Sequence, residues 1–88
     1  MSFRLSKSKN KKYDVYYDGK WISFGDSRYE HYKTSNIIPN ELHIYKEHND
    51  KNRRQLYRNR ASKIKNKYGE LTFNNPRYPN FWAFHLLW

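Results

Sequence analysis

The sequence predicts an α+β fold, in which a small antiparallel β-hairpin or meander packs on one basic amphipathic helix and a short apolar C-terminal helix. Three observations support this fold class. Asp18-Gly19, a strong two-residue turn signal, separates two runs rich in Tyr, Trp and Ile. A basic stretch over residues 48–69 is bounded by residues that typically begin and end a helix. Residues 81–88 form the most apolar run of the chain.

The composition is that of one small basic domain. The chain has 88 residues and a formal net charge of +10, with 36% hydrophobic residues and a mean hydropathy of −1.27. That hydropathy alone would favour disorder, but 19% of the residues are aromatic and each can bury a large area, so we expect a folded core rich in Tyr and Trp. So large a charge opposes compaction, which indicates an anionic partner: nucleic acid first, an acidic protein surface second.

Other partners and locations are not expected. No stretch is long and apolar enough to span a bilayer, and the basic helix lacks a broad apolar face, so no membrane partner is predicted. The sequence has no Cys and therefore no disulfide or thiol chemistry. No apolar signal core follows the basic N-terminus, so we do not expect a secreted protein.

Residues 1–12 are predicted to form a flexible basic N-terminal arm, ahead of a single small α+β domain at residues 13–88. Five basic residues stand among Ser and Asn in the arm: Arg4, Lys7, Lys9, Lys11 and Lys12. Two interpretations are open. The arm is either a disordered, solvated terminus or a segment that follows phosphates.

Residues 13–24 are predicted to form a β-hairpin whose register follows from the Asp18-Gly19 turn. The expected pairs are Tyr17 with Lys20, Tyr16 with Trp21, Val15 with Ile22, and Tyr13 with Phe24. Alternation then gives one core face, which carries Tyr13, Val15, Tyr17, Ile22 and Phe24. On the opposite face, Tyr16 and Trp21 are either a stabilising pair partly covered by the C-terminal segment or a stacking platform for bases.

Two less regular segments follow the hairpin. Residues 28–34 alternate aromatic and polar side chains, so we expect a third strand that extends an antiparallel meander. Residues 35–47 contain Pro39, which breaks any continuous element, and are predicted to be a loop insertion. Its anchoring apolar residues are Ile37, Ile38, Leu42, Ile44 and Tyr45.

The basic helix is predicted to run from His48 to Gly69. Asn49 or Asp50 is expected to cap its first turn, and Gly69 is placed to end its last turn. From Lys51 to Lys67 the stretch holds eight Lys or Arg residues and no acid. The face predicted to belong to the fold carries Tyr57, Ala61, Ile64 and Tyr68.

The arginines of this helix divide into two groups. Arg53 and Arg60 border the apolar face, where arginines usually stack on aromatic rings or pair with acids such as Asp14, Asp26 or Glu30. Arg54, Arg58 and Lys65 have no structural role that the sequence reveals, so they are the better candidates for phosphate contacts. Changing these three residues together to Glu is expected to abolish binding without unfolding the protein.

The C-terminal part is predicted to complete the core. Residues 70–80 are turn-rich and allow a short strand over residues 71–73. Asn80 is expected to cap one or two helical turns within residues 81–88. A helix there is apolar nearly all round and must be buried, so it is predicted to plug the core against sheet and helix. The alternative is an exposed patch that docks on another subunit.

No catalytic, cofactor or metal-binding constellation stands out, so the sequence is not predicted to encode an enzyme. The one close His–acid pair, His48-x-Asp50, stands at a helix start, where a local hydrogen bond explains it. One enzyme alternative is a small GIY-YIG nuclease, which residues 15–17 and 22–27 faintly resemble. In that family an Arg and a metal-binding Glu follow on helices, whereas here Arg28 follows too closely. A nuclease would cleave DNA with Mg²⁺, and Arg28→Ala would abolish the cleavage.

A further resemblance covers about residues 12–88. The chain carries Phe24-Gly25, His48-x-Asp50, Arg53-Arg54, Tyr57 and Arg60, and closes with Phe81-Trp82-Ala83-Phe84-His85-Leu86-Leu87-Trp88. This pattern resembles small basic proteins of nucleocytoplasmic large DNA viruses, a family without an assigned function. Ala61 stands where the family usually has His, residues 35–46 look like an insertion, and relatives often continue beyond the position of Trp88. The resemblance implies a viral origin, in a virion or in host cytoplasm or nucleus.

These observations favour a small basic viral protein that binds nucleic acid through phosphate contacts, in genome packaging or condensation. The alternative is a virion structural or capsid-associated protein that binds acidic protein surfaces. The candidate nucleic-acid-binding residues are Arg54, Arg58, Lys65, Lys51, Lys63, Lys67, Arg4, Lys7, Lys9, Lys11, Lys12, Tyr16 and Trp21.

Overall fold

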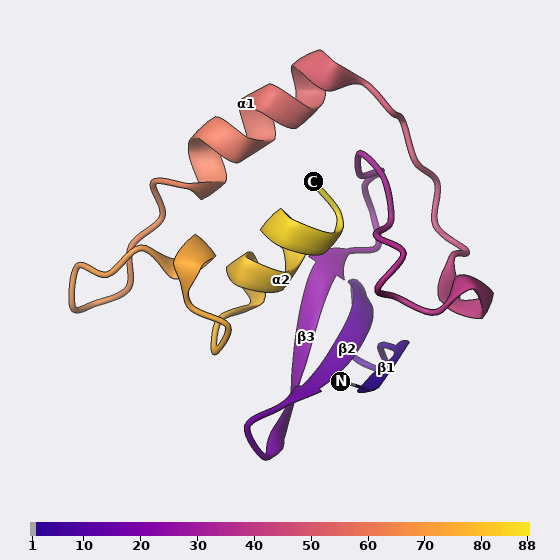
Figure 1. Cartoon of the computed structure of the whole chain (residues 1–88), viewed down its shortest axis with the longest axis horizontal. Coiled ribbons are helices and arrows are strands. Elements are labelled where there is room, and N and C mark those ends of the chain that lie inside the picture. Colours follow the sequence, from indigo (N-terminus) through magenta and orange to yellow (C-terminus); the bar gives the residue numbers. More distant parts are fainter. Residues whose placement is uncertain (1) are drawn as a thin grey trace.

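The computed structural model describes residues 2–88 and has the predicted α+β architecture, a three-stranded antiparallel sheet with two helices (Figure 1). The elements are β1 (Ser2–Leu5), β2 (Lys11–Tyr17), β3 (Lys20–Asp26), α1 (Lys51–Ala61) and α2 (Pro79–Leu86), with single 3-10 turns at Asn40–Leu42 and Thr72–Asn74. The sheet order is β1-β2-β3. In Figure 1, α2 lies between the sheet and α1, so the apolar helix is the central layer.

The β2–β3 hairpin has the predicted register. Tyr17 pairs with Lys20, Tyr16 with Trp21, Val15 with Ile22, and Tyr13 with Phe24. Asp18 and Gly19 both have positive φ, as a two-residue turn between right-twisted strands requires. The predicted core face is confirmed, because Tyr13, Val15, Ile22 and Phe24 are buried and Tyr17 is half-buried.

The third strand lies at the N-terminus and not after the hairpin. β1 pairs with β2 from Ser2 opposite Tyr16 to Leu5 opposite Tyr13, so the prediction of a flexible arm is wrong for the described residues of that segment. Asn10, with a φ of 64°, helps to turn the chain between the two strands. Residues 28–34, the predicted third strand, instead form a bend in which His31 makes one isolated parallel bridge with Glu47.

Residues 35–47 form a loop that apolar residues anchor, as expected, although only some of them are inside. Ile38 is fully buried, while Leu42 and Tyr45 pack against the core from its edge. The Tyr13 hydroxyl ties the loop to the sheet by donating to the Leu42 carbonyl at 2.7 Å. Ile37 and Ile44 are exposed and anchor nothing.

Helix α1 begins where the sequence predicts and ends eight residues before Gly69. The Asp50 carboxylate caps the first turn by accepting hydrogen bonds from the backbone N–H groups of Asn52 and Arg53. The last helical residue is Ala61. The predicted inner positions beyond it, Ile64 and Tyr68, are therefore 51% and 72% exposed.

Distant side chains end the helix. The Asn80 amide donates to the Ala61 carbonyl, and Thr72 donates to the Ile64 carbonyl through both its backbone N–H and its hydroxyl. These contacts take carbonyls that a longer helix would use itself. The Asn66 side chain then turns the chain by accepting from two backbone N–H groups, those of Tyr68 and Glu70. Asn80 thus caps the end of α1 and not the start of α2, where Tyr78 is the N-cap and Pro79 follows.

Helix α2 is the predicted core plug. Trp82, Ala83, Phe84, Leu86 and Leu87 are buried, which excludes the alternative of an exposed docking helix for these residues. The segment before it, where a short strand was allowed, is a 3-10 turn at Thr72–Asn74.

Gly25 is the glycine that the packing requires. Its φ is +78°, and a Cβ added there would lie 2.9 Å from the Leu87 Cδ1 and 3.1 Å from the Lys12 Cβ. Gly25→Ala is expected to lower the free energy of unfolding by roughly 2–4 kcal/mol, since backbone strain and overpacking add. Gly19→Ala is the matched control, with a φ of +83° but no heavy atom within 4 Å, and is expected to cost only about 1 kcal/mol. Urea unfolding followed by circular dichroism measures both. Equal losses would show that residue 25 has room for a side chain.

Candidate functional site

Most acidic side chains are engaged within the protein. Four acids form ion pairs. Asp14 pairs with Arg4, Asp18 with Arg77, Asp26 with Arg28, and Glu30 with both Lys46 and Arg53. Glu47, Asp50 and Glu70 accept hydrogen bonds from neighbouring backbone or amide groups. The two bonds from the Arg28 guanidinium hold the pKa of Asp26 at about 2. Few carboxylates therefore remain to neutralise the other cations.

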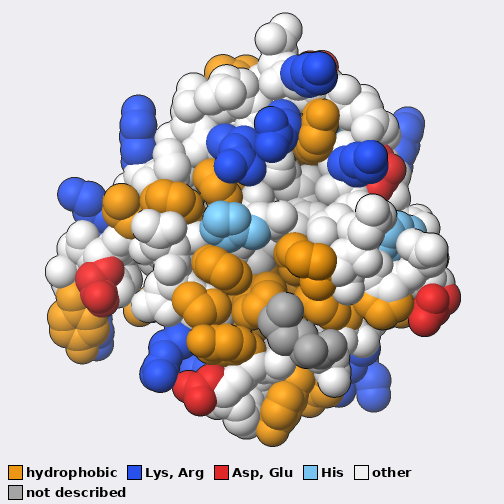
Figure 2. Space-filling view, in the orientation of Figure 1, with side chains coloured by type: hydrophobic (Ala, Val, Ile, Leu, Met, Phe, Trp, Pro, Cys, Tyr) orange, Lys and Arg blue, Asp and Glu red, His pale blue; other side chains and the backbone are white. Residues whose placement is uncertain are grey.

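Exposed cations without an ion pair are distributed over the described part of the chain. They are Lys7, Lys9, Lys11, Lys20, Lys33, Lys51, Arg60, Lys63, Lys65 and Lys67. Of the predicted site residues, Lys51 stands at the start of α1, while Lys63, Lys65 and Lys67 stand in the loop after it. Lys7 and Lys9 lie in the β1–β2 connection and Lys11 begins β2. Figure 2 shows Lys and Arg at many separate points of one face, with hydrophobic side chains gathered between them.

Arg54 and Arg58 have structural roles, contrary to the prediction. The Arg54 Nε donates to the Trp88 carbonyl at 2.6 Å, and its guanidinium lies 5.1 Å from the Tyr32 ring centroid. The Arg58 guanidinium lies 4.0 Å from the Phe84 ring centroid and donates to the Phe84 carbonyl at 3.4 Å. Arg58 thus docks α1 on the last turn of α2, where cations are favoured, while Arg54 docks it on Tyr32 and on Trp88, two residues beyond α2.

The inner face of α1 keeps the predicted Tyr57 and Ala61 and also includes Arg54 and Arg58. Tyr57 stacks on Trp88, with ring centroids 4.2 Å apart and an interplanar angle of 8°, and Ala61 is buried. Changing Arg54 and Arg58 to Glu would disrupt this docking, so such a variant cannot report on binding alone. Arg53 pairs with Glu30, one of the acids expected for it.

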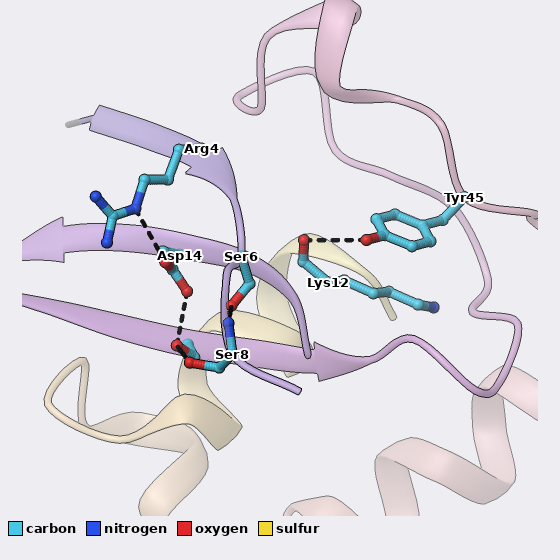
Figure 3. A network of polar contacts seen from close by, with 7 residues as sticks. Arg4, Ser6, Ser8, Lys12, Asp14 and Tyr45 are labelled. Carbon is cyan, nitrogen blue, oxygen red and sulfur yellow. Dashed lines mark hydrogen bonds and ion pairs between the residues drawn. The ribbon is translucent and has the colours of Figure 1, made fainter. Parts of the chain in front are cut away.

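The Tyr16–Trp21 pair forms as predicted, with ring centroids 5.3 Å apart and the two residues 45% and 40% exposed. Arg4 of β1, and not the C-terminal segment, covers it, because the Arg4 guanidinium lies 3.8 Å from the Trp21 ring centroid. Arg4 also reaches the buried Asp14, which Ser23 bonds from the other side (Figure 3). Burial raises the pKa of Asp14, but the bonds from Ser23 and Arg4 outweigh this and lower it below its ordinary value.

Lys12 is buried and not available at the surface, which corrects its assignment to a phosphate-binding arm. It is 2% exposed, and in Figure 3 its side chain extends along Tyr45, away from the Arg4–Asp14 network. Burial lowers the pKa of Lys12 to about 8, against the opposing effect of the Asp26 and Glu30 charges. Its Nζ lies 2.7 Å from the Nδ1 of His31.

His31 continues a buried polar chain from Lys12. A protonated Lys12 can only donate, so His31 accepts at Nδ1 and its Nε2 donates to the Thr34 hydroxyl at 2.7 Å. The Thr34 backbone N–H donates in turn to the Glu47 carboxylate at 2.6 Å. Burial and then the Lys12 charge lower the pKa of His31 to about 4. The hairpin register could have indicated that Lys12 belongs to the sheet. Tyr13 pairs with Phe24, so the next position places Lys12 opposite Gly25.

Lys12 and His31 stand at the wall of a cavity of about 640 Å³ between α1, α2 and one end of the sheet. The α1 wall carries Arg53, Leu56, Tyr57 and Arg60, one helical face by spacing. The other lining residues are Lys11, Gly25, Asp26, Tyr29, Glu30, Pro79, Asn80, Ala83, Leu87 and Trp88. The volume is in the range of small-molecule sites, and sequence reasoning did not predict it.

The His48–Asp50 pair is local, as expected. The Asp50 backbone N–H donates to the His48 Nδ1 at 2.9 Å. The other ring nitrogen of His48 is buried without a hydrogen-bond partner, and the ring packs 5.1 Å from the Trp88 centroid. Within residues 2–88, no three His, Asp or Glu side chains are grouped to hold a metal ion. Neither helix of the described chain has the length and apolar character needed to cross a membrane.

Comparison with known proteins gives one partial match. The model of DUF5754, a family of unknown function, matches residues 1–36, a span that contains all three strands and ends before the buried Ile38. No curated protein and no solved structure matches the chain significantly. Functional inference therefore rests on the residues and their geometry.

Proposed function

We propose that this protein binds nucleic acid through phosphate contacts of low sequence specificity, in packaging or condensing a genome. The observation that carries the proposal is the set of exposed cations without ion pairs, in a protein whose carboxylates are mostly engaged. Lysines on loops and turns suit a flexible polyanion, because they can adjust to phosphates without reading bases.

The proposed contacts are revised by the structure. Lys63, Lys65 and Lys67 are exposed at alternate positions after α1, and we call them the post-helix lysines. Lys7, Lys9, Lys11 and Lys51 remain candidates, as do Tyr16 and Trp21 for stacking. A base would stack on the Trp21 ring only beside or in place of Arg4. The resemblance to small proteins of large DNA viruses supports a viral genome as the ligand.

The alternative partner is an acidic capsid surface, which would use the same lysines. The apolar C-terminal segment would be a docking element for that partner if it were exposed, but α2 is buried in the core. Nucleic acid is therefore the better-supported partner. Polyglutamate at equal charge concentration is expected to compete only weakly with a labelled oligonucleotide, whereas a protein built for acidic surfaces would be displaced readily.

Changing the post-helix lysines together to Glu is expected to weaken oligonucleotide binding by at least tenfold and to reduce its salt dependence, because each phosphate contact releases counterions. Fluorescence anisotropy at several salt concentrations measures both effects, and circular dichroism checks the fold. The control reverses Lys20 and Lys33, which are also exposed and make no ion pair but are not among the proposed contacts, and is compared with a variant that reverses only Lys63 and Lys65. Wild-type binding that is absent, or insensitive to salt, would refute the proposed function.

A further inference from the structure

The cavity between α1, α2 and the sheet combines an apolar floor with aromatic and basic walls. Ala83 and Leu87 are buried and Gly25 is half-buried, and these three lining residues leave a floor without polar side chains. Trp88, stacked on Tyr57, adds aromatic surface at the side. Such a lining favours a flat, largely apolar ring system.

Lys12 is a buried lining residue whose ammonium group makes one side-chain hydrogen bond within the described chain. An ammonium group has three N–H donors, and the hydrogen bond recorded for the Lys12 Nζ within the described residues goes to His31. The Tyr45 ring lies 5.5 Å from the Nζ to the centroid, and the charges of Asp26 and Glu30, which line the same cavity, also act on the ammonium. Burying this group costs stability, as its lowered pKa shows. A ligand that presents carbonyl oxygens or ring nitrogens would satisfy the spare donors.

The rim of the cavity is positive. Arg60 from α1 and Lys11 from β2 are exposed, line the cavity and make no ion pair in the described chain. The other charged groups at the wall are largely neutralised, Arg53 by Glu30 and Asp26 by Arg28. An anionic group on the ligand is therefore expected at the rim, and the ring system inside.

We propose that this cavity holds the unpaired base of a nucleotide, with hydrogen bonds from Lys12 to the base and with the phosphate held by Arg60 and Lys11. The inference rests on the proposed function, because it names the form of nucleic acid that the protein selects. A base in a duplex is stacked and cannot enter without flipping out, so single strands are bound in preference to duplexes. A free mononucleotide offers the same chemistry as an unpaired nucleotide within a strand.

Amide chemical shifts in ¹H–¹⁵N spectra of the full chain test this proposal. Titration with AMP or UMP is expected to shift the amides of Gly25, Ala83 and Leu87, and ribose 5-phosphate is expected to leave them in place. A 12-nucleotide single strand should shift the same amides, and its duplex should leave them in place while shifting the amides of the post-helix lysines. Shifts with the single strand alone assign the site to nucleotides within a strand. Shifts with the mononucleotides as well show that a free nucleotide also fits.

Two results would overturn the inference. One is that no nucleotide or single strand moves the cavity amides, and the other is that ribose 5-phosphate moves them equally. Duplex binding through the post-helix lysines would survive either result, so the two proposals fail separately. Loss of all binding would refute both.

Substitutions give an independent test. Lys12→Met keeps the length of the side chain and removes its donors, and is expected to weaken mononucleotide binding about tenfold or more, since hydrogen bonds to charged groups are among the stronger ones. Lys20→Met, at the exposed hairpin turn, is the matched control and is expected to change it little. If Lys12→Met fails to fold, Arg60→Met provides the test instead. Arg60 is exposed, so its substitution should leave the fold intact and still weaken mononucleotide binding. Unchanged affinity in the folded variant would overturn the proposal.

Discussion

Replacing Trp82 with Ala is expected to lower the free energy of unfolding by about 3–5 kcal/mol. Trp82 is 3% exposed, and its ring lies 5.7 Å from Tyr17 and 6.4 Å from Phe24 between centroids. Its indole N–H also donates to the Pro76 carbonyl at 2.7 Å. The substitution would leave a cavity between α2 and the sheet, and a domain of this size has little stability to spare. Urea unfolding followed by circular dichroism measures the loss.

Two variants show whether burial is the cause. Trp82→Phe keeps an aromatic ring and loses the indole donor, so its loss should be smaller. Trp21→Ala removes a tryptophan that is 40% exposed on the opposite face of the sheet, and should cost much less than Trp82→Ala. Equal losses for the two alanine variants would mean that α2 does not complete the core.

Local chemistry made the hairpin and the start of α1 predictable. The Asp18-Gly19 turn sets the register of β2 and β3 by itself. The Asp50 carboxylate caps the helix by accepting from backbone N–H groups only two and three residues further along the chain. The strand β1 had weaker signals. It is four residues long, its partner lies about ten residues away, and Ser6, Ser8 and Asn10 between them are weaker turn signals than Asp-Gly.

The end of α1 was not predictable because distant residues determine it. Asn80 and Thr72 take carbonyls at the helix end, and no local breaker stands between Ala61 and Gly69. The predicted inner face extended to Tyr68 for the same reason. When the helix stops at Ala61, Arg54 and Arg58 become the residues that meet the C-terminal end of α2.

The candidate site residues also divide into those that local sequence predicts and those that depend on tertiary contacts. Exposed lysines such as Lys63 and Lys65 were identified from charge alone, since no tertiary contact was needed to leave them at the surface. The cavity required the docking of α1 on α2, which depends on arginine contacts that the sequence did not reveal. Lys12 and His31 come from segments 19 residues apart and meet only because the chain folds back after β3.

Acid is expected to destabilise the fold through His31, in a pH range where carboxylates do not yet titrate. The pKa of His31 is lowered from about 6.5 to about 4, by burial first and by the Lys12 charge second. Between these values the unfolded chain binds more protons than the folded one, so stability falls as pH falls. The free energy of unfolding should drop by about 2 kcal/mol between pH 7.5 and pH 5. Protonation would also turn the accepting Nδ1 into a second donor facing the Lys12 ammonium.

His31→Gln isolates this contribution, because a glutamine can accept from Lys12 and donate to Thr34 without titrating. Urea unfolding of the variant is expected to change much less with pH over the same range. A smaller slope of the same sign should remain from His48, whose pKa burial also lowers. Glu47 raises the pKa of His31 and cannot produce the effect, while Lys12, whose pKa is about 8, is mostly protonated in the folded state over this range and adds little. An unchanged slope in His31→Gln would place the acid sensitivity elsewhere and would show that His31 is not held neutral in the fold.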